Sequence, residues 1–441
     1  MVGFFVSFVS LYKTKIKLNA DPQIEQTVDH LFRREWGKLV TVLTKLFGPQ
    51  NLQLAEDVVQ DTLLKALNTW KINGLPENPS AWLFTAARNK AIDVLRKQQR
   101  QVQYAKSIAP LLQSEYTLAP KVNETVNANS IQDDQLRMMF VCCHPALSAE
   151  AQIAIILKTL CGFSVAEIAK AFVTNYDTIE KRLYRARQAL KENKVAFELP
   201  PGAELDQRLE NVLTAIYLLF NEGYNSTAHE ALIRKDLMQE AMRLCELICR
   251  NSLVNHSNAQ ALLSLMCFTA ARNDARMDAD GNILLLKQQD RTKWNSALIS
   301  EAIVHLEQSA STGETICKYH IEAGIAFEHA KAAQYADTNW ENILHYYNLL
   351  YQLFPTPIIA LNRAIVIGEL YGPGKGIHAI ETIPGIGALK KYYLLPAALG
   401  ELHWQQKEYD KAVQYFKEAM GLTQSAAEKK LLQQKINQQR N

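Results

Sequence analysis

Residues 138–148, MMFVCCHPALS, contain two adjacent cysteines and a histidine, which are residue types that can bind zinc. A zinc site needs four ligands, and these usually come in pairs separated by two or more residues. Cys142 and Cys143 have no such spacing, and the next cysteine follows only at the far end of another predicted helix. Pro145 ends the first helix, and Ser148 can cap the second. We therefore expect small buried thiols at a helix junction and no metal ligands.

A second group of residues that could do chemistry lies in the C-terminal half. Gln289, Asp290 and Arg291 are followed closely by Trp294, and single acids and histidines are scattered around them, namely Glu222, His229 and His320. The chain has no His-x-x-x-His spacing, no nucleophile elbow and no phosphate-binding loop. An Asp–Arg pair beside a tryptophan favours a salt bridge that joins domains, with a packed indole. The sequence therefore predicts a protein that is not an enzyme and has no cofactor.

The bulk composition is that of an ordinary globular protein. The chain has 441 residues, a net charge of +3 and seven cysteines. This length predicts roughly three domains, and an odd number of irregularly spaced cysteines indicates reduced thiols in a cytosol. The N-terminal run MVGFFVSFVSLYKTKIK has about a dozen apolar residues, fewer than the ~20 that span a bilayer. We expect a cytoplasmic protein without stable membrane insertion.

The pattern along the chain predicts an all-α protein. Apolar residues recur at spacings of three and four, whereas alternating strand patterns are scarce. Two breaks divide the chain: a polar stretch at 101–130, which we interpret as a linker, and ELPPGAELD, whose paired prolines must stop a helix. Three helical segments remain, at 20–100, 131–197 and 207–441.

The first segment contains a helix with an acidic face. In LAEDVVQDTLLKAL the apolar stripe consists of Ala55, Val58, Val59, Leu63 and Ala66. The residues outside this stripe predict an acidic and amide-rich exposed surface, formed by Glu56, Asp57, Gln60, Asp61 and Lys65. Taken alone, such a pattern is typical of a solvated helix surface.

The next predicted helix is basic and begins with aromatic residues. Asn78 can cap it, and Pro79 suits its first position. Between Trp82 and Lys106 there are six basic residues and one acidic residue. This density favours phosphate neutralisation together with base stacking on a separated strand. The candidate DNA-binding residues here are Trp82, Arg88, Asn89, Arg96, Lys97 and Arg100.

DVVQDTLLKAL followed by NPSAWLFTAARNKAIDVLRK resembles region 2 of the extracytoplasmic-function group of bacterial sigma-70-type RNA polymerase sigma factors. The resemblance implies that Asp57, Gln60 and Asp61 dock on the clamp helices of the polymerase β′ subunit. It also implies that the basic helix and the loop before it recognise and melt the −10 promoter element.

The second segment predicts a helix-turn-helix. Ser164 and Glu167 make a capping box, and Asn175 can cap a second helix. In that helix the buried stripe is formed by Ile179, Leu183, Ala186 and Leu190. Polar and basic side chains on the opposite face suit base edges and phosphates. The alternative is a basic solvated helix. The candidate DNA-binding residues are Asp177, Thr178, Lys181, Arg182 and Arg185.

DTIEKRLYRARQAL resembles sigma region 4, which recognises the −35 element and, in this family, contacts the polymerase β flap. Asp177 stands where the family often has glycine, so the base preference can differ. The Cys-Cys-His-Pro run, LFNEGYN and LLLKQQDRTKWN also resemble a subgroup that has a long C-terminal extension.

The third segment predicts tetratricopeptide-like helical repeats. In LLPAALGELHWQQKEYDKAVQYFKEAMGL, Gly400 and small alanines permit close helix packing, and Phe416 fills the space between the helices. An earlier unit puts Ala364 at the place of Gly400. Such repeats can be a plain scaffold or a groove for a protein or peptide partner.

Together these features predict a sigma factor with a fused helical domain that regulates it in cis. Its partners would be core RNA polymerase and both double- and single-stranded promoter DNA. Two alternatives remain at this point: a dimeric helix-turn-helix transcriptional regulator, and a tetratricopeptide-type interaction scaffold. Neither alternative requires two separate helices that face nucleic acid.

Overall fold

The computed structural model describes residues 22–437 except 105–127, 173, 226–233, 253, 255, 312–315 and 424. The regular elements of the described residues are α-helices and short 3-10 helices. The extended pairing found in the described part is an isolated antiparallel β-bridge between Met277 and Ile283. This confirms the all-α prediction. No helix of the described part is long and apolar enough to cross a membrane. The N-terminal apolar run lies outside the described residues.

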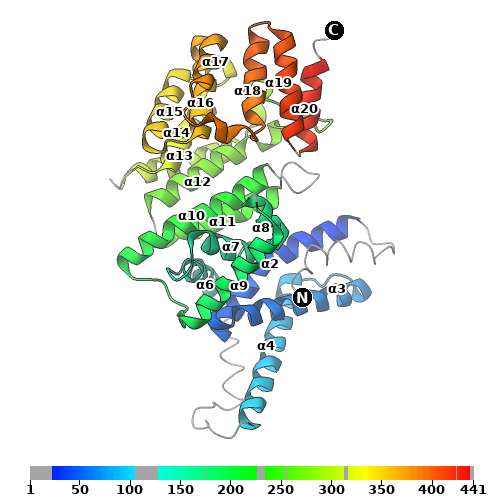
Figure 1. Ribbon diagram of the computed structural model, residues 1–441. Helices are drawn as coiled ribbons and strands as arrows, with labels where there is room; N and C mark the ends of the chain where they lie inside the picture. Colours follow the sequence, from blue (N-terminus) through cyan, green and yellow to red (C-terminus); the bar gives the residue numbers. More distant parts are fainter. Residues whose placement is uncertain are drawn as a thin grey trace. The chain divides into compact units, whose positions relative to one another are not determined.

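The chain forms two compact units. Unit 1 consists of Met1–Phe220 and Gln239–Leu247, and unit 2 consists of Asn221–Met238 and Ile248–Asn441. In unit 1, α2 packs against α3, α4, α6 and α7 (Figure 1). The helices that contribute to unit 1 are α2 (Pro22–Phe47), α3 (Leu52–Asn73), α4 (Pro79–Tyr104), α6 (Ala128–Cys142), α7 (Ala149–Thr159), α8 (Val165–Ala171), α9 (Tyr176–Glu192), most of α10 (Gly202–Tyr224) and part of α11 (Lys235–Arg250).

Side-chain caps fix where the functional helices of unit 1 begin. The Asn78 side chain accepts a hydrogen bond from the Ala81 amide at 3.0 Å at the start of α4. Ser164 and Glu167 form the reciprocal capping box before α8, with N···O distances of 3.1 and 2.7 Å. Asn175 caps α9 through the amide of Thr178 at 2.8 Å. These caps satisfy backbone amides that have no partner within the helix, and they confirm the predicted helix starts.

The linker prediction for residues 101–130 falls largely on residues outside the described part. At its two ends, α4 continues to Tyr104 and α6 begins at Ala128.

The beginning of the C-terminal extension packs within unit 1. The buried guanidinium of Arg208 on α10 donates to the carbonyl oxygen of Phe140 on α6 at 2.9 Å. Asn211 donates to the Gln152 side chain of α7 at 2.8 Å. Leu209, the next residue along α10, is buried as well. By its contacts this part of the extension therefore belongs with the helix-turn-helix segment. The boundaries of the three segments at 20–100, 131–197 and 207–441 stay predictions.

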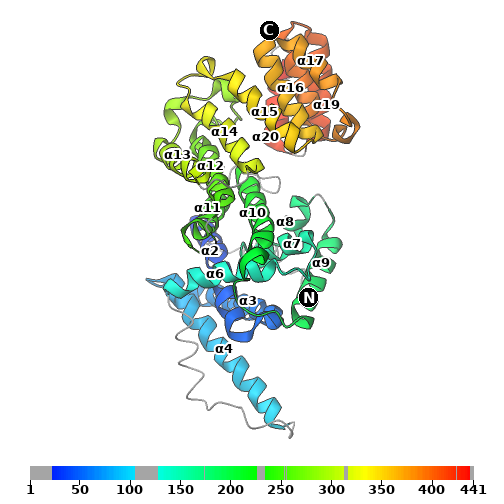
Figure 2. The same cartoon turned by 90° about the vertical axis from the view of Figure 1, so that its left-hand side faces the viewer.

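Unit 2 is a succession of antiparallel helical hairpins. From α14 onward each helix packs against the next one in the chain, and Figure 2 shows α14, α15, α16 and α17 following one another in this way. The helices are α12 (Ser257–Ala271), α13 (Ser296–Ser311), α14 (Lys318–Lys331), α15 (Trp340–Leu353), α16 (Pro357–Tyr371), α17 (Pro373–Glu381), α18 (Leu394–Gln405), α19 (Tyr409–Leu422) and α20 (Ala426–Asn437).

Close contacts inside two of these hairpins are compatible with the tetratricopeptide prediction. A Cβ added to Gly400 on α18 would lie 2.7 Å from the Phe416 ring of α19, so glycine is required there. In the preceding hairpin the close approach is between Gly368 on α16 and Gly376 on α17. The structure therefore places the tight contact at Gly368, one helical turn after the Ala364 that the repeat spacing suggested. Ala364 was chosen because alanine is also small, and its side chain is likewise buried.

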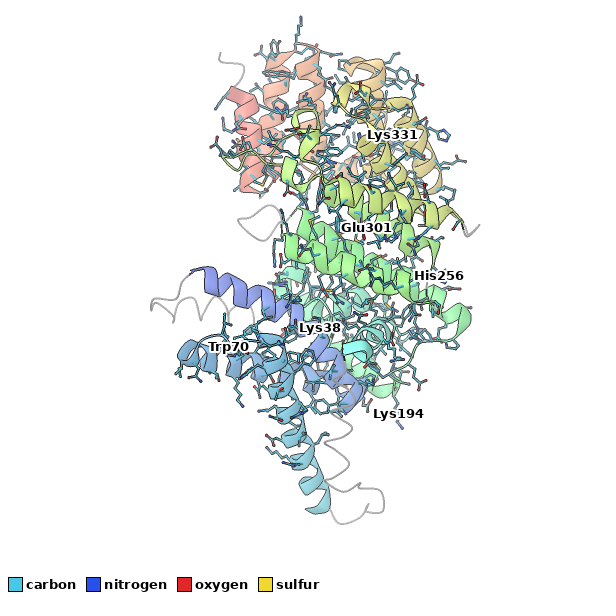
Figure 3. The ribbon with its side chains drawn as sticks, turned by 180° about the vertical axis from the view of Figure 1, so that it is seen from behind. Lys38, Trp70, Lys194, His256, Glu301 and Lys331 are labelled. Atoms are coloured by element: carbon cyan, nitrogen blue, oxygen red, sulfur yellow. The ribbon has the colours of Figure 1, made fainter. Side chains whose placement is uncertain are left out.

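The Asp290–Arg291 pair is structural, but it is not the salt bridge that we expected. Asp290 accepts hydrogen bonds from the backbone and hydroxyl of Thr292. Arg291 donates instead to the carbonyl oxygens of His329 and Ala332 at 2.5 and 2.6 Å. These carbonyls lie at the C-terminal end of α14, which is marked by Lys331 in Figure 3. The last carbonyls of a helix have no partner within it, and an arginine side chain can satisfy them.

The indole of Trp294 is packed as predicted. It is buried, and the guanidinium groups of Arg272 and Arg291 lie 5.4 and 4.9 Å from its ring centroid. Desolvation by burial, reinforced by the same two arginines, lowers the pKa of His329 to about 4. These contacts hold α14 to the segment before α13. His229, one of the scattered acids and histidines considered in the sequence, lies outside the described residues.

Candidate polymerase and nucleic-acid interface

Cys142 and Cys143 are buried at the junction between α6 and α7, as the sequence predicted. The sulfur of Cys142 lies 3.6 Å from the Thr159 hydroxyl, and burial raises its pKa to about 12. Burial also raises the pKa of Cys143 well above its usual value. Within the described ranges, no three His, Cys, Asp or Glu side chains are grouped so that they could hold a metal ion. Cys142 and Cys143 are therefore core residues, whereas His144 is half-buried.

The acidic face of α3 presents two exposed carboxylates. Asp61 lies 2.9 Å from the ammonium group of Lys90 on α4, and both side chains are about half exposed. Asp57 accepts a hydrogen bond from Gln53 at 3.0 Å. Gln60, between them, is half-buried. The two carboxylates are thus available to a partner, although one of them already has a basic neighbour.

Glu56 is not part of this exposed face, contrary to our expectation. It is only 4 % exposed, and Arg187 on α9 donates to it at 2.6 Å. The periodicity of α3 correctly places Glu56 outside the stripe that faces its own helical bundle. It cannot reveal that a second segment covers this position, because that segment lies more than a hundred residues away. In the sequence, Arg187 is only one of several basic residues in the motif DTIEKRLYRARQAL, and nothing there marks it as the partner of Glu56.

Along α4 the candidate DNA-binding residues lie on its polar side. Trp82 is half-buried, with its ring edge against Trp70 of α3 at a centroid distance of 5.4 Å; Trp70 is labelled in Figure 3. This contact leaves part of the indole accessible and fixes its orientation. Further along the helix Asn89, Arg96 and Lys97 are exposed, Arg88 is half-buried, and the side chain of Arg100 lies outside the described part.

On α9 the apolar stripe and the polar face separate as predicted. The buried residues are Ile179, Leu183, Ala186 and Leu190. On the outer side Asp177, Lys181 and Arg185 are exposed, while Thr178 and Arg182 are half-buried. The Arg182 guanidinium lies over the Phe172 ring at 5.2 Å, which restricts its freedom. Together with the start of α7, this side of α9 lines a groove of about 510 Å³ whose basic side chains are Lys181, Arg182 and Arg185.

We expect Arg185→Ala to weaken promoter binding by about tenfold at physiological salt. The exposed guanidinium is suited to a phosphate or to a guanine edge, and loss of one such contact costs ~1–3 kcal/mol. Loss of a phosphate contact would also reduce the slope of log affinity against log salt by about 1. A salt titration of the polymerase–promoter complex measures both quantities. The matched control is Lys194→Ala, which replaces an exposed lysine just beyond α9 (Figure 3). Equal losses of promoter affinity in the two variants would contradict a specific role of Arg185.

Family comparisons agree with this arrangement of helices. Residues 31–101 match the model of sigma-70 region 2, and residues 137–190 match the model of sigma-70 region 4. Residues 208–310 match a family of unknown function, DUF6596. The first two matches contain the acidic face, the basic helix and the helix-turn-helix, and the third covers the start of the extension.

Individual relatives include an uncharacterised protein and named sigma factors. An uncharacterised protein of Rhizobium meliloti is 34% identical over 379 residues, which cover 86% of this chain and 88% of the relative. The ECF RNA polymerase sigma factor SigL of Mycobacterium tuberculosis is 33% identical over 138 residues, or 31% of this chain and 72% of SigL. The sigma factor YlaC of Bacillus subtilis is 24% identical over 169 residues, or 38% of this chain and 91% of YlaC. No solved structure matches the chain.

The matches to both sigma regions, and to SigL over most of its length, agree with the two helical surfaces of unit 1. The chain therefore belongs to the extracytoplasmic-function group of sigma-70-type RNA polymerase sigma factors.

Proposed function

We propose that the protein binds core RNA polymerase through the acidic face of α3 and directs it to a two-part promoter. Asp57 and Asp61 would contact the β′ clamp helices, and region 4 would contact the β flap. The basic side of α4 would recognise and melt the −10 element, and α9 would recognise the −35 element. The observation that carries the proposal is that exposed carboxylates on α3 and exposed basic side chains on α4 and α9 occur in one compact unit.

Run-off transcription from a promoter library tests this proposal. Core RNA polymerase should start at shared −35 and −10 elements only when the protein is added. The alternative of a dimeric regulator requires promoter binding without core polymerase. The alternative of a scaffold requires that Arg96→Ala and Arg185→Ala change nothing. Absence of protein-dependent start sites, together with absence of core binding, would refute the proposed function.

We also propose that the C-terminal helical domain regulates the sigma regions in cis. Its support is that α10 and α11 pack in unit 1, so the extension is physically coupled to region 4. A chain that ends after Asn251 keeps both helices and removes most of unit 2. We expect its transcription level at limiting core polymerase to differ at least severalfold from that of the full chain. The melting transition of unit 1 should be the same in the full chain and the shortened chain, which shows that both are folded. Equal transcription by these two chains would then contradict regulation in cis.

A further inference from the structure

Three arginines of unit 2, in and beside the segment between α12 and α13, have no carboxylate partner among the described residues. Arg272 donates to the Gln289 side chain at 3.3 Å. Arg276 donates to the carbonyl oxygen of Tyr224 at 2.5 Å. Arg291 donates to the two backbone carbonyls at the end of α14 and to no acid. Neutral acceptors thus satisfy part of each guanidinium and leave its charge without a counter-ion.

Helix ends compensate this charge only in part. Arg272 is the C-cap residue of α12, and the carbonyls that accept from Arg276 and Arg291 lie at the ends of α10 and α14. A helix C-terminus carries roughly half a negative charge, so the three ends offset about half of the three positive charges. Burial, together with the charge of Arg272, lowers the pKa values of Arg276 and Arg291. The arginines therefore repel one another.

The indole of Trp294 is the common contact of two of these guanidinium groups. Arg272 and Arg291 lie 5.4 and 4.9 Å from its ring centroid. The amide of Asn295 donates to the Ala271 carbonyl oxygen at 2.9 Å, which holds the indole beside the end of α12. The side chain of Trp294 is only 7% exposed, yet its N–H has no acceptor among the described protein atoms.

This group of side chains has more donors than acceptors. Besides the indole N–H of Trp294, Arg291 Nε is buried without a partner in the described part of the chain. His329 Nδ1 is a third such atom, and it can donate in one tautomer of the neutral ring. Buried donors are costly when no acceptor reaches them. The missing complement is therefore an acceptor that also carries negative charge.

A small oxyanion has both properties. The planar fork of a guanidinium binds two oxygens of a carboxylate or a phosphate at once, and two such groups meet at Trp294. Arg272 and Arg291 are half-buried, so part of each side chain is accessible to a ligand from solvent. Asp337, the acid that acts on Arg291, already accepts a hydrogen bond from the Gln334 amide at 3.1 Å.

We propose that Arg272, Arg291 and Trp294 form a binding site for a small oxyanion, of which inorganic phosphate is the simplest form. The two guanidinium groups supply charge and paired donors, and the indole supplies one further N–H. Arg291 and Trp294 belong to the run LLLKQQDRTKWN, which takes no part in the polymerase and promoter contacts proposed above. The site thus gives the C-terminal domain a ligand of its own.

Phosphate should bind to the full-length protein and stabilise unit 2. Isothermal titration calorimetry at constant ionic strength measures the affinity without polymerase or promoter. The thermal transition of unit 2 should rise with phosphate, because the ligand binds the folded site and not the unfolded chain. Sodium chloride at the same ionic strength should give no such rise. Acetate, tested in the same way, shows whether the site prefers a carboxylate to a phosphate.

Two substitutions remove different parts of the site. Arg272→Gln should weaken phosphate binding by about tenfold, because a hydrogen bond to a charged group is lost. Trp294→Phe keeps an aromatic ring but removes the N–H, and should weaken binding several-fold. Lys293→Gln removes a positive charge from an exposed position of the same segment. It is the matched control and should bind phosphate as the wild type does.

The ring resonance of His329 locates the ligand in the wild-type protein and requires no variant. Phosphate should shift it, whereas the resonance of His378, exposed on α17, should stay in place. Equal affinities in the wild type, Arg272→Gln and Trp294→Phe, with melting curves showing that all three are folded, would overturn the proposal. Absence of both phosphate and acetate binding in the wild type would overturn it as well.

Discussion

Asp61→Arg should abolish promoter-directed transcription by this protein. The exposed carboxylate of Asp61 is part of the face that we propose docks on polymerase, and only Lys90 pairs with it among the described ion pairs. Reversal of its charge would place an arginine beside Lys90 and oppose any basic partner. A charge pair that becomes desolvated at an interface is worth ~2–5 kcal/mol when one member is lost, which is at least a thirtyfold loss of affinity.

Titration of core RNA polymerase with the labelled protein, followed by run-off transcription, measures this loss directly. Asp133→Arg makes the same charge reversal at an exposed position of α6 and should bind core polymerase normally. Asp61→Asn should lie between the wild type and Asp61→Arg. Wild-type affinity in Asp61→Arg would show that polymerase docks elsewhere.

Phe416→Ala should destabilise unit 2 by about 3–5 kcal/mol, the usual cost of removing a large buried ring. The Phe416 side chain is 1 % exposed, and its ring fills the space against Gly400, Ala412 and Ala419. Gly400→Ala should destabilise the same hairpin by ~1–3 kcal/mol, because its Cβ would overlap that ring. Chemical denaturation of the full chain, followed by circular dichroism, should show an earlier transition in both variants.

Tyr371→Ala provides the comparison for this prediction. Tyr371 also lies in unit 2, but it is 62 % exposed, so its replacement should change stability by no more than ~0.5 kcal/mol. If Phe416→Ala changed the stability of unit 2 no more than Tyr371→Ala does, the contact between Phe416 and Gly400 would have no stabilising role. If the unit 2 transition falls while transcription is unchanged, the last hairpins would be scaffold rather than regulator.

Local features of the fold could be predicted because they depend on residues close together in sequence. The capping box of Ser164 and Glu167, the cap at Asn175 and the buried stripe of α9 each involve a few consecutive turns. The same is true of Gly400 and Phe416, which face each other across a short helical hairpin. The residue types at these positions permit few other arrangements.

Contacts between distant segments could not be predicted in this way. An unpaired glutamate on a polar helix face is usually exposed, so nothing in the sequence near Glu56 indicates that Arg187 covers it. Likewise, Arg291 follows Asp290 directly, yet it contacts carbonyls about forty residues further along the chain. Both errors have one cause: the expectation considered only residues nearby in sequence, whereas tertiary packing brought a partner from a distant segment.

The contact between Arg208 and Phe140 has a consequence for the order in which the protein folds during synthesis. Region 4 leaves the ribosome before α10 and α11, although both helices complete its unit. At ~5–20 residues per second, translation of the chain between α9 and residue 247 takes about 3–11 seconds. We therefore expect the nascent chain to have an incomplete region 4 throughout that interval. A promoter-binding protein that matures in this order completes its DNA-recognition unit only after its C-terminal extension has begun to emerge.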